Sequence, residues 1–185
     1  MEKVSRLVGL FLLEGGSAME NIILIGMPGC GKSSVGVVLA KALGMDFIDS
    51  DLLIQRREGK RLAQIIEEAG DEGFRAIENE VNAAIDAQGC VIATGGSVIY
   101  GPEAMAHLRA IGTVVYLQLS YEQVEERLGD LHARGVTVKP GQTLRDLYNE
   151  RCPMYERHAH VTIPCDGLRL REVVAQIRQT LGLNA

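Results

Sequence analysis

A glycine-rich segment near the N-terminus constrains the fold of this chain more than any other feature. Residues 26–33 read G-M-P-G-C-G-K-S and match G-x-x-x-x-G-K-[ST], the pattern of a phosphate-binding loop. Residues 21–25 before it are an apolar run typical of a buried strand, and residues 34–43 after it have the apolar spacing of a helix. Because the motif requires a strand before it and a helix after it, this context favours a phosphate site over a chance match in a glycine-rich turn.

The loop contains the residue types that polyphosphate binding needs. Its glycines allow the backbone to curl so that successive N–H groups point at phosphate oxygens, and the positive end of the following helix adds to the attraction. Lys32 is placed to reach the β- and γ-phosphates, and the Ser33 hydroxyl is placed to ligate Mg²⁺. We therefore predict that a nucleotide is bound by Gly29, Cys30, Gly31, Lys32, Ser33 and Ser34.

Composition and charge exclude some classes of partner. The 185 residues suit one domain, which at this size buries roughly 70% of its extended-chain surface. The net charge is −5, and no basic run is longer than a pair such as Arg56-Arg57, so a nucleic-acid partner is not expected. With no Trp and 4% aromatic residues, the chain also lacks a stacking platform for single strands.

The four cysteines have no spacing typical of a metal site. We expect Cys90, Cys152 and Cys165 to be reduced, partly buried thiols. Cys30 differs because it lies in the phosphate-binding loop, where it would be close to bound phosphate and open to alkylation.

The first eighteen residues are hard to interpret. Lys3 and Arg6 precede an apolar run at 7–13 that faintly resembles a signal peptide, but the run has only seven residues and is followed by Glu14. It is far too short to span a membrane. We interpret residues 1–18 as an N-terminal extension, disordered or upstream of a true start at Met19, and residues 19–185 as one domain. A nucleotide-using enzyme is expected in the cytoplasm.

Strands and helices alternate along the remaining chain. A short strand is predicted to end at Asp49, and further strands are predicted over 90–94, 113–119 and 161–163. Helices are predicted over 52–58, 62–69, 72–86, 102–111, 121–128, 144–157 (interrupted near Pro153) and 170–181. Residues 129–142 lose this periodicity and contain Gly135, Pro140 and Gly141, which predicts a mobile lid. With the first strand, this order predicts an α/β fold of three layers: a five-stranded parallel sheet with helices on both faces.

Several further motifs resemble one family. They are F-I-D-S-D at 47–51, G-F-R-A-I-E at 73–78, A-T-G-G-S at 93–97, E-R-L at 126–128, an arginine at 134, and N-E-R-C-P-M-Y at 149–155. Together with the loop, in this order, they resemble the shikimate kinases, a group of P-loop small-molecule kinases, from residue 21 to about residue 181. The resemblance implies transfer of the γ-phosphoryl group of ATP to a hydroxyl of a small carboxylic acid, most directly shikimate to shikimate 3-phosphate in aromatic amino acid biosynthesis. It also implies a P-loop kinase fold. Because the chain is a short, acidic one-domain kinase with no evident apolar surface stripe, we expect a monomer.

The resemblance assigns the phosphoryl-transfer residues. Ser33 and Asp49 would bind Mg²⁺, with Asp49 acting through water, because Mg²⁺ keeps most of its waters. The catalytic residues would be Lys32, Asp51 and the lid residue Arg134, which would close onto the phosphates. Asp51 would accept a hydrogen bond from the attacking hydroxyl. The alternative for Asp51 is an N-cap of the helix that starts at Leu52.

The acceptor side would be built by two arginines and two glycines. Arg75 and Arg151 would grip the substrate carboxylate, which a guanidinium fork suits, while Gly95 and Gly96 would bring backbone close to the substrate. The alternative for each arginine is an ion pair, of Arg75 with Glu72 or Glu78 and of Arg151 with Glu150. Arg127 would lie over the adenine, or instead on a solvated helix face.

Two departures from the family leave the acceptor open. The usual third glycine is Ser97, which requires a negative φ there or offers a hydroxyl to a different acid. Arg134 is followed by Gly135-Val136-Thr137 instead of Pro-Leu-Leu. The alternatives are a related kinase acting on gluconate or homoserine, and a nucleotide-binding module without turnover. The paired arginines favour a carboxylate acceptor over a nucleoside monophosphate, and neither nucleic acid nor membrane is expected as a partner.

Overall fold

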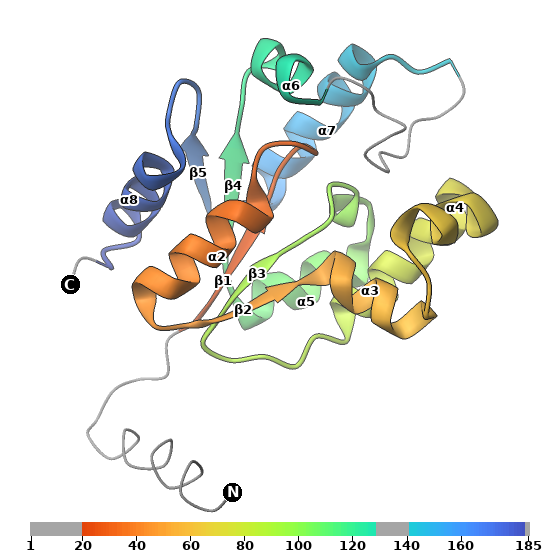
Figure 1. Ribbon diagram of the computed structural model, residues 1–185, viewed down its shortest axis with the longest axis horizontal. Coiled ribbons are helices and arrows are strands. Elements are labelled where there is room, and N and C mark those ends of the chain that lie inside the picture. The colour runs from red at the N-terminus through yellow and green to blue at the C-terminus, as the bar shows by residue number, and fades with distance from the viewer. Residues whose placement is uncertain (1–19, 129–140, 184–185) are drawn as a thin grey trace, which may run out of the picture.

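A five-stranded parallel sheet forms the centre of the molecule (Figure 1). The computed structural model describes residues 20–128 and 141–183, so the predicted extension and most of the predicted lid lie outside the described residues. The strands are β1 (Asn21–Ile25), β2 (Asp46–Asp49), β3 (Cys90–Ala93), β4 (Gly112–Gln118) and β5 (Val161–Pro164). Their order is β2-β3-β1-β4-β5, and every pairing is parallel. The predicted five-stranded sheet is confirmed.

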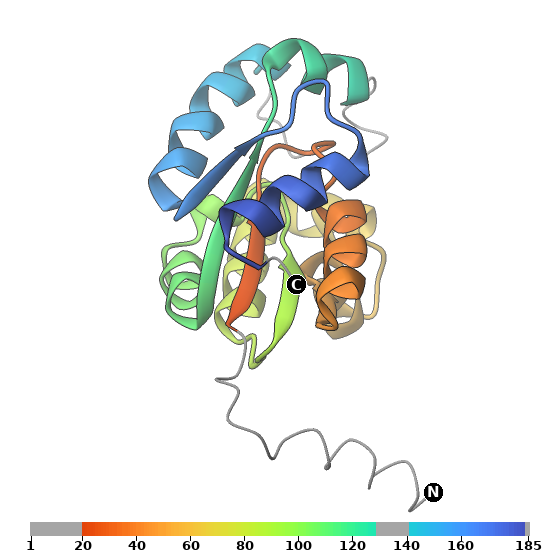
Figure 2. The same ribbon diagram turned by 90° about the vertical axis from the view of Figure 1, so that its left-hand side faces the viewer.

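Helices cover both faces of the sheet. In Figure 2, α2 (Lys32–Leu43) and α8 (Leu170–Thr180) lie on one side, while α5 (Pro102–Ile111) and α7 (Leu144–His158) lie on the other. The remaining helices are α3 (Ser50–Glu58), α4 (Leu62–Ala83), α6 (Tyr121–Leu128) and a single 3₁₀ turn, η1 (Val98–Tyr100). Because both faces are covered, the central strand β1 is buried along its whole length and reads as a continuous apolar run.

The register of the strands brings the predicted site segments to one edge. Asp49 of β2 is opposite Ala93 of β3, and Ala93 is opposite Leu24 of β1. The chain therefore leaves all three strands at nearly the same level, where open α/β sheets bind their ligands. The phosphate-binding loop follows β1, Asp51 follows β2, and Gly95 follows β3.

Helix α3 begins two residues earlier than the sequence predicts. Asp49, the last residue of β2, is its N-cap: the Asp49 carboxylate accepts a hydrogen bond from the Asp51 N–H at 3.0 Å. Asp51 is therefore inside the first turn of α3, and the alternative that made Asp51 the N-cap is wrong. The reason is that Asp49 has the extended backbone of a capping residue, with φ −107° and ψ 116°.

The two helix interruptions that the sequence predicts, at Gly70 and near Pro153, have different outcomes. The helices predicted over 62–69 and 72–86 both lie within α4 and meet at a kink where Gly70 is non-helical, with φ 68° and ψ 176°, so the predicted break at Gly70 is confirmed, although α4 ends at Ala83. The predicted break near Pro153 is absent, because α7 runs through that proline. Its buried residues Leu147, Arg151 and Tyr155, each at most 1% exposed, hold the helix in place despite the lost hydrogen bond.

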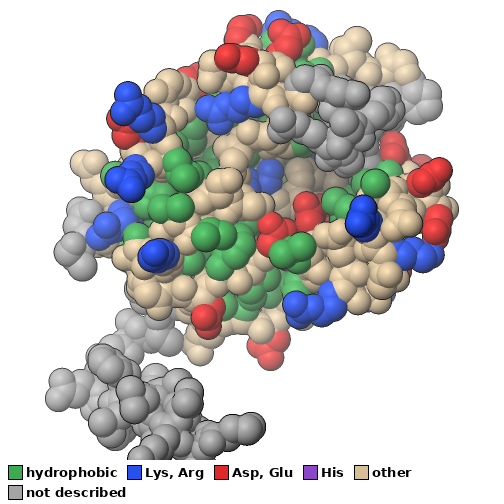
Figure 3. Space-filling view, viewed as in Figure 1, with side chains coloured by type: hydrophobic (Ala, Val, Ile, Leu, Met, Phe, Trp, Pro, Cys, Tyr) green, Lys and Arg blue, Asp and Glu red, His purple; other side chains and the backbone are tan. Residues whose placement is uncertain are grey.

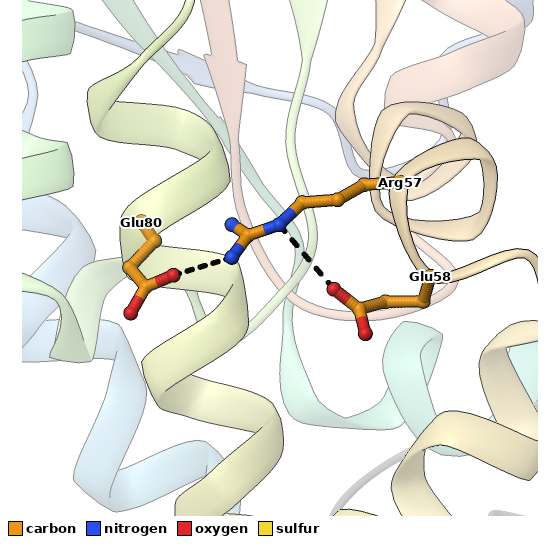
Figure 4. Close-up of polar contacts among 3 residues, drawn as sticks. All are labelled: Arg57, Glu58 and Glu80. Carbon is orange, nitrogen blue, oxygen red and sulfur yellow. Dashed lines mark hydrogen bonds and ion pairs between the residues drawn. The ribbon is translucent and has the colours of Figure 1, made fainter.

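Helices α3 and α4 share a small hydrophobic cluster that is separate from the main core. Ile54 of α3 packs with Ile65, Phe74 and Val81 of α4. On the surface, Arg57 of α3 joins the two helices by pairing with Glu80 of α4 at 2.6 Å, and it also approaches Glu58 (Figure 4). The Arg57 and Glu80 side chains are exposed and their pairing contributes little, so the buried cluster holds α3 on α4.

None of the helices described here has both the length and the apolar character needed to cross a bilayer.

Candidate active site

The phosphate-binding loop connects β1 to α2 in a conformation that needs its glycines. Gly26, Gly29 and Gly31 have φ values of 146°, 77° and 92°, which other residues rarely adopt. A side chain at Gly26 would also come within 2.8 Å of the Leu117 carbonyl oxygen. The spacing that identified the loop therefore reflects backbone geometry.

Lys32 extends back into the loop from the first turn of α2. The side chain is only 8% exposed, and its Nζ donates to the carbonyl oxygens of Gly26 at 2.8 Å and Met27 at 3.1 Å. The Cys30 thiol lies beneath the loop, 3.8 Å from Lys32 Nζ, and is 3% exposed. The sulfur is thus turned toward the protein interior, which shields it from the alkylation that the sequence suggested.

Ser33 and Asp49 meet where α2 begins and β2 ends. The Ser33 hydroxyl donates to Asp49 Oδ2 at 2.7 Å. Mg²⁺ prefers oxygen ligands and keeps several of its waters, so a hydroxyl and a carboxylate that lie together beside the phosphate-binding loop suit a Mg²⁺ site. The described residues contain no group of three His, Cys, Asp or Glu side chains suited to a metal.

A pocket of about 400 Å³ opens beside the loop. Figure 3 shows this face hollowed near its centre, with basic and acidic side chains close together in and around the hollow. Two sets of predicted residues line the pocket: Gly29, Gly31, Lys32, Ser33 and Ser34 from the loop and α2, and Asp51, Gly95, Gly96 and Arg151 from three other segments. The fold therefore places the predicted phosphate side opposite the predicted acceptor side.

Two buried carboxyl groups face each other across Gly95. Asp51 Oδ1 and Glu78 Oε1 are both buried without a hydrogen-bond partner in the described structure. A Cβ atom at Gly95 would be 2.1 Å from Glu78 Oε1 and 3.0 Å from Asp51 Oδ1, so only glycine fits between them. Burial raises the pKa of Asp51 to about 6, with a further rise from Asp49, and burial raises the pKa of Glu78 to about 7, with a further rise from Asp51.

Ser97 is directed at Glu78. Its backbone has φ −97°, so a residue with a side chain fits where the family has a third glycine. Its hydroxyl donates to Glu78 Oε2 at 2.5 Å, and this hydrogen bond partly offsets the rise in the pKa of Glu78. The Ser97 hydroxyl is thus bound within the protein.

The two predicted carboxylate-binding arginines both lie close to Tyr100. Arg151 is 1% exposed, and its Nη1 would be 3.3 Å from a Cβ at Gly96. The Arg75 guanidinium carbon lies 4.0 Å from the centre of the Tyr100 ring. Arg75 takes part in no ion pair among the described residues, so its predicted alternative partners Glu72 and Glu78 do not hold it.

A family model described as shikimate kinase matches residues 28–182. The chain belongs to the shikimate kinase family. It is 38% identical over 162 residues to the shikimate kinase of Pasteurella multocida, a match that covers 85% of this chain and 93% of that one. It is 41% identical over 167 residues to the shikimate kinase of Alteromonas mediterranea, covering 89% and 98% of the two chains.

Solved structures of shikimate kinases have the same fold. The enzyme from Acinetobacter baumannii in complex with shikimate superposes with a TM-score of 0.79 at 36% identity, covering 90% of this chain and 94% of that one. The enzyme from Aquifex aeolicus gives a TM-score of 0.76 at 32% identity, covering 88% and 96%. As a member of this family, the chain is a kinase that transfers a phosphoryl group to a hydroxyl group.

Of the two remaining predicted nucleotide-side arginines, Arg127 is among the described residues and Arg134 is not. Arg127, at the end of α6, lies beside the loop: its Cβ would be 3.8 Å from a Cβ at Gly29. It therefore borders the phosphate side and is not on a remote surface. Arg134 and the Gly135-Val136-Thr137 segment lie outside the described residues.

Sequence reasoning missed Glu78, Ser97 and Tyr100 as partners within this shikimate kinase site. Glu78 was visible only as the last residue of F-R-x-x-E, where an ion pair with Arg75 is the simplest interpretation. Its burial next to Ser97 depends on α4 and the β3 edge coming together. Tyr100 belongs to a 3₁₀ turn of three residues, which is too short to produce a periodic signal.

Proposed function

We propose that this protein transfers the γ-phosphoryl group of ATP to a hydroxyl of shikimate, giving shikimate 3-phosphate for aromatic amino acid biosynthesis. The observation that carries the proposal is a single pocket with a phosphate-binding loop on one side and Asp51 with a buried arginine on the other. The related Acinetobacter baumannii enzyme, described in complex with shikimate, supports the choice of acceptor.

On the nucleotide side, the chain supplies positive charge and backbone donors. Gly29 to Ser34 would surround the phosphates, and Lys32 would exchange its two carbonyl contacts for phosphate oxygens. Arg127 would contact the nucleotide from the adjacent helix end. Arg134 keeps its assigned role of neutralising charge in the transition state, on the resemblance alone.

We assign the Mg²⁺ site to Ser33 and Asp49. The Ser33 hydroxyl and the Asp49 carboxylate lie together beside the loop, which supports this assignment, with Asp49 acting through water. Bound there with ATP, Mg²⁺ would neutralise charge on the phosphates. Asp49 also caps α3, so the same side chain fixes the helix that presents Asp51.

On the acceptor side, Asp51 would orient and deprotonate the attacking hydroxyl. With a pKa of about 6 the carboxylate is mostly ionised at pH 7, yet it is more basic than an ordinary aspartate. The hydroxyl proton would pass to Asp51 Oδ1 while the oxygen bonds to the γ-phosphorus and ADP departs. Arg75 and Arg151 would hold the carboxylate of shikimate, and Gly95 and Gly96 would allow it to approach the backbone.

The oligomeric state, compartment and partners of the enzyme belong to the same proposal. We infer a monomer that acts in the cytoplasm, where ATP is available, and that binds neither nucleic acid nor membrane. The net charge of −5 supports the lack of nucleic-acid binding.

ADP release in a coupled assay tests the function directly. With Mg²⁺ and ATP, we expect turnover with shikimate and much lower turnover with gluconate or homoserine. Lys32→Ala should reduce kcat by at least about 100-fold, because a preorganised charge at the phosphates is lost. Turnover only with another acid would replace shikimate as the acceptor, and tight ATP binding without turnover on any acid would indicate a non-catalytic module.

Arg75→Ala separates acceptor binding from nucleotide binding. We expect KM for shikimate to rise at least about tenfold, because one fork to the carboxylate is removed, while KM for ATP stays within about twofold. Equal effects on both substrates would mean that Arg75 has only a structural role.

A further inference from the structure

Tyr100 is the one aromatic side chain that both acceptor arginines approach in the described structure. The Arg75 guanidinium carbon is 4.0 Å from its ring centre and that of Arg151 is 5.4 Å away. Arg151 Nε also donates to the Tyr100 hydroxyl at 3.4 Å. A guanidinium over a tyrosine ring is attracted by the negative face of the ring.

The polar end of Tyr100 also has a contact outside the two arginines. Its hydroxyl donates to Glu150 Oε1 at 2.8 Å, and Glu150 Oε2 accepts from the Gln142 amide at 2.7 Å. Burial raises the pKa of Tyr100, so the hydroxyl keeps the proton that it donates to Glu150. The Tyr100 ring is therefore contacted by Arg75 over its face and by Glu150 at its hydroxyl.

The two arginines come from different helices. Arg75 is on α4 and Arg151 is on α7, and both helices pack against the η1 turn that carries Tyr100. Arg75 Nε is buried without a hydrogen-bond partner among the described residues. The ring is thus the contact that the described structure gives to the charged end of Arg75, and it lies close to both of these like charges.

We propose that Tyr100 is a positioning residue that sets the spacing and orientation of Arg75 and Arg151 and thereby the affinity for the carboxylate of the acceptor. The inference rests on the proposed function, because it concerns the carboxylate site of that reaction. Tyr100 need not touch the substrate to have this effect.

Two substitutions separate the ring from the hydroxyl. Tyr100→Leu removes both contacts, and we expect KM for shikimate to rise about tenfold, with kcat and KM for ATP within about twofold. Tyr100→Phe keeps the ring face and removes the hydroxyl, so a rise of about threefold or less is expected. An unchanged KM for shikimate in Tyr100→Leu, or a loss confined to kcat, overturns the proposal.

A second tyrosine supplies a matched control. Arg145 lies over the ring of Tyr121 at 3.3 Å, so Tyr121→Leu removes the same kind of contact outside the pocket. We expect it to leave KM for shikimate unchanged. A rise like that of Tyr100→Leu would mean that the effect is general destabilisation, and it would overturn the proposal.

Double substitution tests whether Tyr100 acts through Arg75. If it does, Tyr100→Leu should raise KM much less in an Arg75→Ala background than in the wild type, because coupled residues are not additive. A full tenfold rise in both backgrounds contradicts the inference. If the wild type does not phosphorylate shikimate at all, the proposed function fails; if it does and Tyr100 has no effect on KM, only the inference fails.

Discussion

At the scale of single residues, the acceptor side depends on a few buried polar contacts. The Ser97 hydroxyl donates to Glu78 Oε2, while Glu78 Oε1 and Asp51 Oδ1 border Gly95 and have no hydrogen-bond partner among the described residues. Hydrogen bonds to a buried ionised carboxylate are stronger than those to its neutral form. The contribution of Ser97 therefore depends on whether Glu78 carries its charge.

This dependence gives a prediction for Ser97→Ala. The hydrogen bond lowers the pKa of Glu78, so removing it raises that pKa further above the ordinary value. By linkage, the stability lost should grow as the pH rises through about 7, reaching about 1–3 kcal/mol when Glu78 is ionised and less at pH 5. Urea unfolding at pH 5 and pH 8 measures both values; an equal loss at the two pH values would contradict this assignment.

The residue scale also shows where prediction from sequence fails. The loop residues were predictable because the motif is contiguous and its glycines have a backbone reason to be there. The Glu78–Ser97 contact joins residues 19 positions apart through the packing of α4 on the sheet edge, and no local pattern contains that information. The Tyr100 contacts with Arg75 and Arg151 are likewise purely tertiary.

At the scale of elements, Asn21 ties three segments together at the start of the sheet. Its amide donates to the carbonyl oxygens of Ala87 at 2.7 Å and Ile111 at 3.0 Å, and its Oδ1 accepts from the Cys90 N–H at 2.9 Å. The residue is 2% exposed. It thus satisfies backbone groups just before β3 and just before β4, on either side of β1.

Asn21→Ala should destabilise the protein by about 3 kcal/mol or more, because it leaves two carbonyls and one N–H unsatisfied near the interior. Asn21→Asp is nearly the same shape but cannot donate to the two carbonyls, so a comparable loss is expected from it. Denaturant unfolding measures both free energies. A loss below about 1 kcal/mol in Asn21→Ala would show that water replaces these contacts at little cost.

The elements themselves were largely predictable, for physical reasons. The inner strands β3, β1 and β4 are largely buried and appear as nearly continuous apolar runs, and the short, partly exposed edge strands β2 and β5 were predicted as well. Helix boundaries were less predictable, since Asp49 serves as an N-cap two residues before the expected start of α3, and α7 continues through Pro153. In both cases a tertiary or capping contact overrides the local signal.

At the scale of the whole molecule, the buried carboxyl groups link stability to pH. Burial raises the pKa of Glu78 from 4.5 to about 7, with a further rise from Asp51 and partial offsets from Ser97, Arg151 and Lys32. The folded protein holds this proton over a range in which the unfolded chain releases it. The stability present below pH 4.5 is therefore lost as the pH rises to about 7.

Glu78→Gln isolates this effect. Because glutamine does not titrate, the variant should gain stability relative to the wild type as the pH rises from 4.5 to 7, by a total on the order of 3 kcal/mol. Unfolding free energies of both proteins across this range measure the difference. Parallel pH curves would mean that Glu78 ionises in the folded protein much as it does in the unfolded chain.

The separate hydrophobic cluster under α3 and α4 bears on how such an enzyme can diversify. Ile54, Ile65, Phe74 and Val81 support the helices that carry Asp51, Arg75 and Glu78, whereas the phosphate-binding loop depends on β1 and the main core. Substitutions in the small cluster can therefore change acceptor preference while the residues that bind the nucleotide keep their positions. Acceptor specificity can thus evolve in this fold without changes to the ATP-binding loop.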